Sequence, residues 1–249
     1  MADVQPVGFI IGGSGGIGTA LTRLLAASGW QVHVAARNEA GLAPLAELAN
    51  VTTYVLDARD VAAVADVCGQ VVAASGRLDA AVNLAGSLLL KPAHRTSVDE
   101  WDDTIATNLT TAFALVRAAA PLMRSTGGSI VLMASAAASI GLNNHEAIGA
   151  AKAGVIGLAR SAAASYANWN VRVNVVSPGM TETPLTASLL ANDGARQASE
   201  KLHALGRVGT ATDVASAIAW LIEPSNAFVT GQVIGVDGGL ASLVPRPRG

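Results

Sequence analysis

Residues 12–18 read GGSGGIG, and this glycine-rich run decides how the rest of the chain is interpreted. It directly follows the apolar run VGFII at 7–11 and directly precedes a leucine- and alanine-rich stretch with helical spacing. A strand, a glycine turn and a helix in that order let backbone N–H groups and the helix N-terminus face a pyrophosphate. The run therefore predicts a dinucleotide-binding unit, and the alternative is a glycine turn that is merely structural.

Two glycine fingerprints fit this run equally well. Gly13, Gly15 and Gly18 match G-x-G-x-x-G, whereas Gly12, Gly16 and Gly18 match G-x-x-x-G-x-G. Either match alone is weak, and it is the strand before the run and the helix after it that give it weight. The residues expected around the phosphates are Gly12, Ser14, Gly16, Ile17 and Gly18.

Short β-branched runs alternate with longer alanine-rich stretches along the chain, as in QVHVAA at 31–36 followed by AGLAPLAELA at 40–49. This alternation predicts an α/β fold over residues 1–249: a single-domain, Rossmann-type doubly wound parallel sheet of about seven strands flanked by helices. Ser97 and Glu100 form a capping-box pattern that opens a helix running to about Pro121, and Gly29 predicts a helix end.

The segment from about 180 to 208 breaks the alternation. It is polar and helical in pattern, and no strand pattern follows it. Loops that depart from a regular scaffold often carry function, so we interpret this segment as a substrate loop or lid.

Composition excludes several classes of protein. A formal charge of −2 with 14% charged residues offers no basic stripe for nucleic acid. The N-terminal residues lack a signal-peptide pattern, and no long uncharged apolar run predicts a membrane span, so we expect a soluble, cytoplasmic protein. One cysteine, Cys68, rules out an internal disulfide, and no metal site is expected.

The end of the second expected strand bears on the choice of cofactor. An NAD-specific site usually places a carboxylate there for the ribose 2′-OH, whereas this chain has Ala36 followed by Arg37. A neutral residue followed by arginine suits a 2′-phosphate, so NADP(H) is favoured over NAD(H); the alternative for Arg37 is an ordinary surface arginine. Asp57, at the end of the third strand, is expected near the adenine or as a helix N-cap.

These residues together resemble the short-chain dehydrogenase/reductase family over essentially the whole chain. The resemblance rests on the glycine run and on further motifs: NLAG at 83–86, Asn108, Ser135, Lys152, SPGMTET at 177–183 and GQVIGVDGG at 231–239. It implies that Asn83, Ala85 and Gly86 lie beside the adenine ribose and that Pro178, Gly179, Thr181 and Thr183 face the nicotinamide. It also implies a homotetramer, with a dimer as the alternative.

The resemblance further implies hydride transfer between nicotinamide and a carbonyl or alcohol carbon. In the family a tyrosine exchanges the hydroxyl proton, a lysine binds the nicotinamide ribose, a serine orients the substrate oxygen and an asparagine holds a water. Ser135, Asn108 and Lys152 match three of these roles, with Lys152 also counted among the cofactor-binding residues. The tyrosine position, four residues before Lys152, holds Ile148.

His145 is the candidate to replace the missing acid. Positions 145, 148 and 152 share one face of a helix that begins early enough, and imidazole titrates near neutral pH. The alternative is an exposed, incidental histidine in a loop or first turn. Neither of the two tyrosines is a credible replacement. Tyr166 would lie about 27 Å from Ile148 if the helix runs that far, and Tyr54 falls on the third expected strand, on the adenine side.

Three functions follow from this pattern. The first is an NADP(H)-dependent oxidoreductase acting on a small carbonyl or alcohol substrate, with the proton supplied by His145, Ser135 or water. The second is reduction of an iminium ion or an activated alkene, which needs less help from an acid. The third is an inactive NADP-binding partner or sensor protein.

Overall fold

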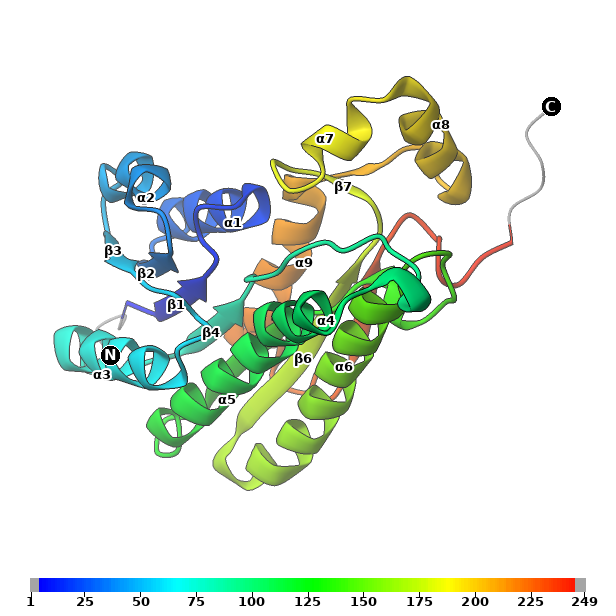
Figure 1. Cartoon of the computed structure of the whole chain (residues 1–249). Helices are drawn as coiled ribbons and strands as arrows, with labels where there is room; N and C mark the ends of the chain where they lie inside the picture. The colour runs from blue at the N-terminus through cyan, green and yellow to red at the C-terminus, as the bar shows by residue number, and fades with distance from the viewer. Residues whose placement is uncertain (1–4, 245–249) are drawn as a thin grey trace.

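Within residues 5–244, which the computed structural model describes, seven strands form one parallel sheet (Figure 1). They are β1 Val7–Ile11, β2 Gln31–Ala36, β3 Val51–Val55, β4 Ala80–Asn83, β5 Gly128–Met133, β6 Val171–Pro178 and β9 Val233–Val236. Their order across the sheet is β3-β2-β1-β4-β5-β6-β9, and every neighbouring pair is parallel. The predicted α/β fold is confirmed; its expected limits, 1 and 249, lie outside the described residues.

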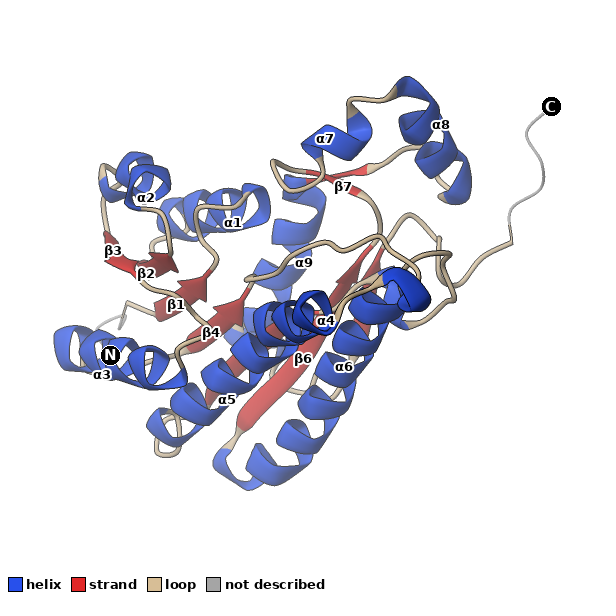
Figure 2. Cartoon of the chain, viewed as in Figure 1, coloured by secondary structure: helices blue, strands red, loops and turns tan. Residues whose placement is uncertain are grey.

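Helices cover both faces of this sheet (Figure 2). The larger ones are α1 Gly16–Ala27, α2 Glu39–Ala46, α3 Val61–Ser75, α4 Val98–Ile105, α5 Thr111–Leu122, α6 Glu146–Tyr166 and α9 Ala211–Ile222. On one face, α3, α5 and α6 bury their apolar residues against the sheet, and on the other α1, α2 and α9 do so. Strands covered on both faces read as continuous apolar runs, as VGFII does.

Local sequence signals set where several helices begin and end. The Ser97 hydroxyl accepts a hydrogen bond from Glu100 N, and the Glu100 carboxylate accepts one from Ser97 N, so the predicted capping box is present. The Asp60 carboxylate accepts hydrogen bonds from two amides at the start of α3. Helix α1 ends at Ala27, and Gly29 follows with a φ of +82°.

The strand order places a crevice beside the glycine run. Chain connections leave β1 toward β2 and β3 on one side and return to β4 on the other, so the order reverses between β1 and β4. Ligands of such open sheets bind at the carboxyl ends of the strands, at this reversal. In the register of the two strands, Ile11 lies beside Asn83, which brings the 12–18 loop close to the residues after β4.

Helices α4 and α5 are joined by a π-helical turn at Ala106–Thr110. The continuous stretch Val98–Leu122 is long and apolar enough to cross a membrane by length and composition alone, with a mean hydropathy of 1.2. Half of that window is buried inside the domain, however, and core helices of soluble proteins pass the same test.

The 180–208 segment forms a small unit of its own above the carboxyl ends of the strands (Figure 1). It contains strand β7 Thr181–Glu182 and helices α7 Ala187–Leu190 and α8 Asp193–Leu202. One detail of the prediction was wrong, because a two-residue strand, β8 Gly209–Thr210, directly follows the segment and pairs with β7. Strands this short leave almost no periodicity in a sequence.

Candidate active site

A cavity of about 680 Å³ opens at the carboxyl ends of the sheet strands. Its walls come from the loops after β1 to β6, from the π-helical turn, from α6 and from the 180–208 segment. The structure brings nearly all of the sequence-predicted residues into this one cavity: Gly12, Ser14, Gly16, Ile17, Gly18, Arg37, Asp57, Ala85, Gly86, Asn108, Ser135, His145, Lys152, Pro178, Gly179, Thr181 and Thr183. Asn83 does not line it.

The glycine run forms a tight turn that packs against the start of the loop following β4. Gly12 has a φ of +80°, and a Cβ at this position would lie 2.7 Å from the backbone of Leu84. A Cβ at Gly18 would clash with the Gly12 carbonyl oxygen. Helix α1 begins at Gly16, and no side chain caps its first amides. The turn is therefore a cradle open to an anion at a helix N-terminus.

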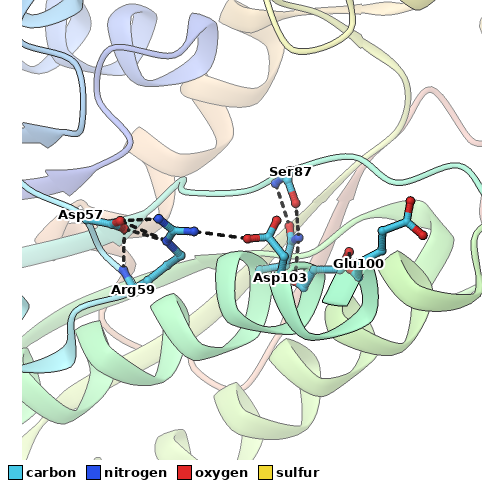
Figure 3. A network of polar contacts seen from close by, with 7 residues as sticks. Asp57, Arg59, Ser87, Glu100 and Asp103 are labelled. Atoms are coloured by element: carbon cyan, nitrogen blue, oxygen red, sulfur yellow. Dashed lines mark hydrogen bonds and ion pairs between the residues drawn. The ribbon is translucent and has the colours of Figure 1, made fainter. Parts of the chain in front are cut away.

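At one end of the cavity, Arg59 links two carboxylates (Figure 3). Its guanidinium bonds Asp57 at 2.6 Å and Asp103, on α4, at 3.2 Å. The hydrogen bond from Arg59 holds the pKa of Asp57 below its usual range. Asp60 is the N-cap of α3, so the expectation that Asp57 caps this helix is wrong, and its expected place near the adenine stays a prediction. Arg59 lines the cavity and was missed by sequence reasoning.

Asn83 lies behind the cavity wall, where it supports the loop after β4. It is 2% exposed. Its amide Nδ2 donates to the Thr111 hydroxyl at 3.1 Å, and its Oδ1 accepts from Ala85 N at 3.0 Å. The position of Ala85 and Gly86 at the cavity surface therefore depends on this buried amide.

Asn108 sits in the π-helical turn with every polar atom of its side chain engaged. Its Nδ2 donates to the Thr104 carbonyl and to the Ser87 hydroxyl, each at 3.0 Å, and its Oδ1 accepts from Ser87 N at 3.2 Å. The residue is 1% exposed. π-helical turns occur frequently at functional sites, and here the turn brings a fixed amide to the cavity wall.

Lys152, on α6, is a buried amine at the base of the cavity. The residue is 6% exposed, and its Nζ donates to the Met133 carbonyl at 3.0 Å. Burial lowers the pKa of Lys152 to about 8, because the charged form loses hydration. A lysine ammonium has three donors, so two remain for groups in the cavity.

Ile148 and Ser135 lie close to Lys152 along the same cavity. Ile148 is 4% exposed and presents only carbon, one helical turn before the lysine. The Ser135 hydroxyl accepts a hydrogen bond from Ala137 N at 3.2 Å and so keeps its own proton free to donate.

His145 lines the cavity, but it precedes helix α6, whereas the sequence prediction required it to be part of that helix. Helix α6 begins at Glu146, so His145 is its N-cap residue, and the proposed alignment with positions 148 and 152 on one helix does not hold. Its Nδ1 lies 2.7 Å from the Asn143 carbonyl, which can only accept, so Nδ1 carries a proton. The ring nevertheless lines the same cavity as Ile148 and Lys152.

Neither tyrosine enters the cavity lining. The Tyr54 hydroxyl bonds His33 at 2.9 Å, and the Tyr166 ring stacks on Trp169. Among the described residues, no group of three His, Cys, Asp or Glu side chains is placed to hold a metal.

Comparison with known proteins assigns this architecture to a family. A family model described as enoyl-(acyl carrier protein) reductase matches residues 12–241. A solved short-chain type dehydrogenase/reductase from Mycobacterium ulcerans superposes with a TM-score of 0.89 at 31% identity, covering 95% of this chain and 90% of that chain. The chain belongs to the short-chain dehydrogenase/reductase family.

Other members of the family give the same result. A 3-oxoacyl-(acyl-carrier-protein) reductase, FabG, of Thermotoga maritima is 36% identical over 237 residues, which are 93% of this chain and 96% of that protein. A tropinone reductase homologue of Arabidopsis thaliana is 36% identical over 239 residues, with 93% and 91% covered. The structure of ElxO with NADP bound superposes with a TM-score of 0.90 at 28% identity, covering 96% of this chain and all of that one. ElxO has also been solved as a tyrosine-to-phenylalanine variant with NADPH bound.

Proposed function

We propose that this family member is an NADP(H)-dependent oxidoreductase that transfers a hydride between nicotinamide and a small carbonyl or alcohol substrate. One observation carries the proposal: a single cavity joins a glycine cradle at a helix N-terminus to a buried lysine amine. The first feature suits a pyrophosphate, and the second suits a ribose hydroxyl.

The residues of the cavity fit a dinucleotide from end to end. The phosphates would be held by Gly12, Ser14, Gly16, Ile17 and Gly18. The adenosine would lie at Asp57, Ala85 and Gly86. Lys152 would bind the nicotinamide ribose, and the nicotinamide itself would face Pro178, Gly179, Thr181 and Thr183. The cofactor supplies the hydride when it is bound. NADP in the ElxO structure supports this choice of ligand.

Arg37 favours the phosphorylated cofactor. It is exposed at the end of β2, lines the cavity, and forms no salt bridge within residues 5–244. Its guanidinium is therefore available for a 2′-phosphate, whereas the Arg59 guanidinium is already paired with Asp57 and Asp103.

Ile148 stands where the resemblance places the tyrosine acid, so the proton must come from elsewhere. His145, Ser135 and ordered water are the candidates, and His145 and Ser135 both line the cavity. If His145 acts, its imidazolium form donates from Nε2, since Nδ1 is committed to the Asn143 carbonyl. Lys152 would then bind the nicotinamide ribose, and Asn108 would fix Ser87 at the cavity wall.

An activated alkene is the second candidate substrate, because the family model carries the description of an enoyl reductase. An iminium ion is less favoured. Among the described residues that line the cavity, Asp57 is the only carboxylate, and it is paired with Arg59 away from Lys152. Nothing in the lining near Ile148 would balance a positive charge on the substrate.

Several further features belong to this proposal. We propose that the segment 180–208 closes over bound ligand as a lid, because its Leu185, Leu189 and Leu202 line the cavity. We also propose a homotetramer, with a dimer as the alternative, and a location in the cytoplasm, as the family resemblance implies.

Calorimetric titration with NADPH and NADH tests the cofactor assignment. We expect tighter binding of NADPH, and Arg37→Ala should weaken NADPH by about 1–3 kcal/mol while leaving NADH unchanged. Equal affinities for the two cofactors would contradict the assignment. A panel of ketones, enals and imines with NADPH then tests the reaction, and binding without turnover on any substrate would favour the inactive partner or sensor.

A further inference from the structure

A buried histidine, His203, ties the 180–208 segment to the backbone that follows β6. It stands at the end of α8, is 3% exposed, and lines the candidate active-site cavity. Neither its role nor its position was apparent from the sequence, where it reads as one polar residue in a polar segment.

Both ring nitrogens of His203 are used within the chain. Nδ1 lies 2.6 Å from the Ser199 carbonyl, and Met180 N donates to Nε2 at 3.1 Å. A carbonyl can only accept and a backbone amide can only donate, so the ring is neutral, with its proton on Nδ1 and a lone pair on Nε2. This geometry is satisfied by one tautomer alone.

The ring also packs directly against the backbone on either side. A Cβ at Gly179 would lie 2.5 Å from His203 Nε2, so only glycine allows the imidazole to approach this closely. On the other side, a Cβ at Gly238 would lie 3.4 Å from His203 Cβ. The imidazole thus lies between the backbone of residues 179–180 and that of Gly238, and it sets the distance between them.

We propose that His203 is a positioning residue that fixes the Gly179–Thr181 backbone for the nicotinamide end of the cofactor. The inference rests on the proposed NADP(H) function, which assigns that backbone to the nicotinamide.

Within the described residues, no charged side chain bonds the His203 ring. A second cavity of about 440 Å³ lies behind the ring, and its charged lining residues are Arg207, Asp213 and Asp237. Arg207 pairs with Asp213, and the Asp237 carboxylate accepts hydrogen bonds from two backbone amides. On α8, Glu200 and Lys201 flank the ring in sequence, and neither side chain bonds it in the described part of the chain.

Two substitutions separate the two hydrogen bonds of the ring. His203→Gln keeps an acceptor where Nε2 stands, whereas His203→Asn keeps a donor toward Ser199 and is too short to reach Met180. The affinities of wild type and both variants are measured for NADPH and for 2′-phospho-ADP-ribose, which lacks the nicotinamide.

His203→Asn should weaken NADPH binding about tenfold or more and leave 2′-phospho-ADP-ribose binding unchanged, because the Met180 amide loses its acceptor. His203→Gln, which keeps that acceptor, should bind both ligands as wild type does.

The possible failures are distinguishable. If wild type binds 2′-phospho-ADP-ribose and NADPH but His203→Asn binds both as well as wild type does, the positioning role is refuted and the proposed function stands. Equal loss of both ligands in His203→Asn would indicate a general structural role and also refutes the inference. If wild type binds neither ligand, the proposed function fails first. Should His203→Asn not fold, a loss of NADPH affinity in His203→Gln, which keeps the acceptor for Met180 N, would still overturn the proposal.

Discussion

Replacing Lys152 with methionine should stabilise the ligand-free protein at neutral pH and destabilise it at alkaline pH. Burial moves the pKa of Lys152 from 10.5 to about 8, so keeping the ammonium charged inside the protein at pH 7 costs about 3 kcal/mol. The hydrogen bond to the Met133 carbonyl offsets about 1 kcal/mol of that cost. Methionine fills a similar volume without charge, so Lys152→Met should raise the free energy of unfolding by about 2 kcal/mol at pH 7.

The pH dependence follows from where the proton is lost. Between about pH 8 and about pH 10.5 the unfolded chain keeps the lysine proton while the native protein has released it, so the unfolded state binds more protons. The free energy of unfolding of wild type therefore rises with pH across this window, relative to the variant. By pH 10.5 the gain of about 3 kcal/mol should leave wild type about 1 kcal/mol more stable than Lys152→Met.

Urea unfolding of both proteins at half-unit pH intervals measures this difference, and every other titrating group cancels in the comparison. A difference that stays constant from pH 7 to about pH 10.5 would show that Lys152 titrates alike in both states, and the reasoning from burial would be wrong. Lys152→Met should also weaken NADPH binding, because the variant has no donor for the ribose.

Two further predictions concern the proton. Ile148→Tyr should introduce or raise the reduction of activated ketones, since the tyrosine hydroxyl would stand one helical turn from Lys152 and beside Ser135. If the variant binds NADPH but reduces no ketone in a broad panel, Ser135 and Lys152 are not placed to support a tyrosine acid. His145→Ala should cost about 10²–10⁴-fold in turnover and spare NADPH affinity if the imidazolium is the acid. Equal turnover by wild type and variant would assign the proton to Ser135 or water.

The fold was predictable because its signals are local. Alternating apolar runs, the capping box at Ser97 and Glu100 and the glycine run each act over a few residues, and each is present in the structure. The residues expected at the site share one edge of the sheet, because parallel strands end together there. That edge is a property of the topology, which the alternation of strands and helices already implies.

What could not be predicted depends on contacts between distant segments or on a single-residue shift. Arg59 matters because α4 brings Asp103 to it across 44 positions of sequence. His203 matters because Met180, 23 residues away, needs an acceptor. His145 was misplaced because the start of α6 differs by one residue from the helix that its alignment required, and helix ends are the least certain part of any such prediction.

Helix α4 and the π-helical turn after it carry two anchors. Asp103 pairs with Arg59, and Asn108 donates a hydrogen bond to the Ser87 hydroxyl. Adding or deleting one residue between them would swing Asn108 about 100° around the helix axis and out of the cavity wall. Residues 104–107 should therefore tolerate no change of length over evolutionary time, and an alignment of functional relatives should show no insertion or deletion there.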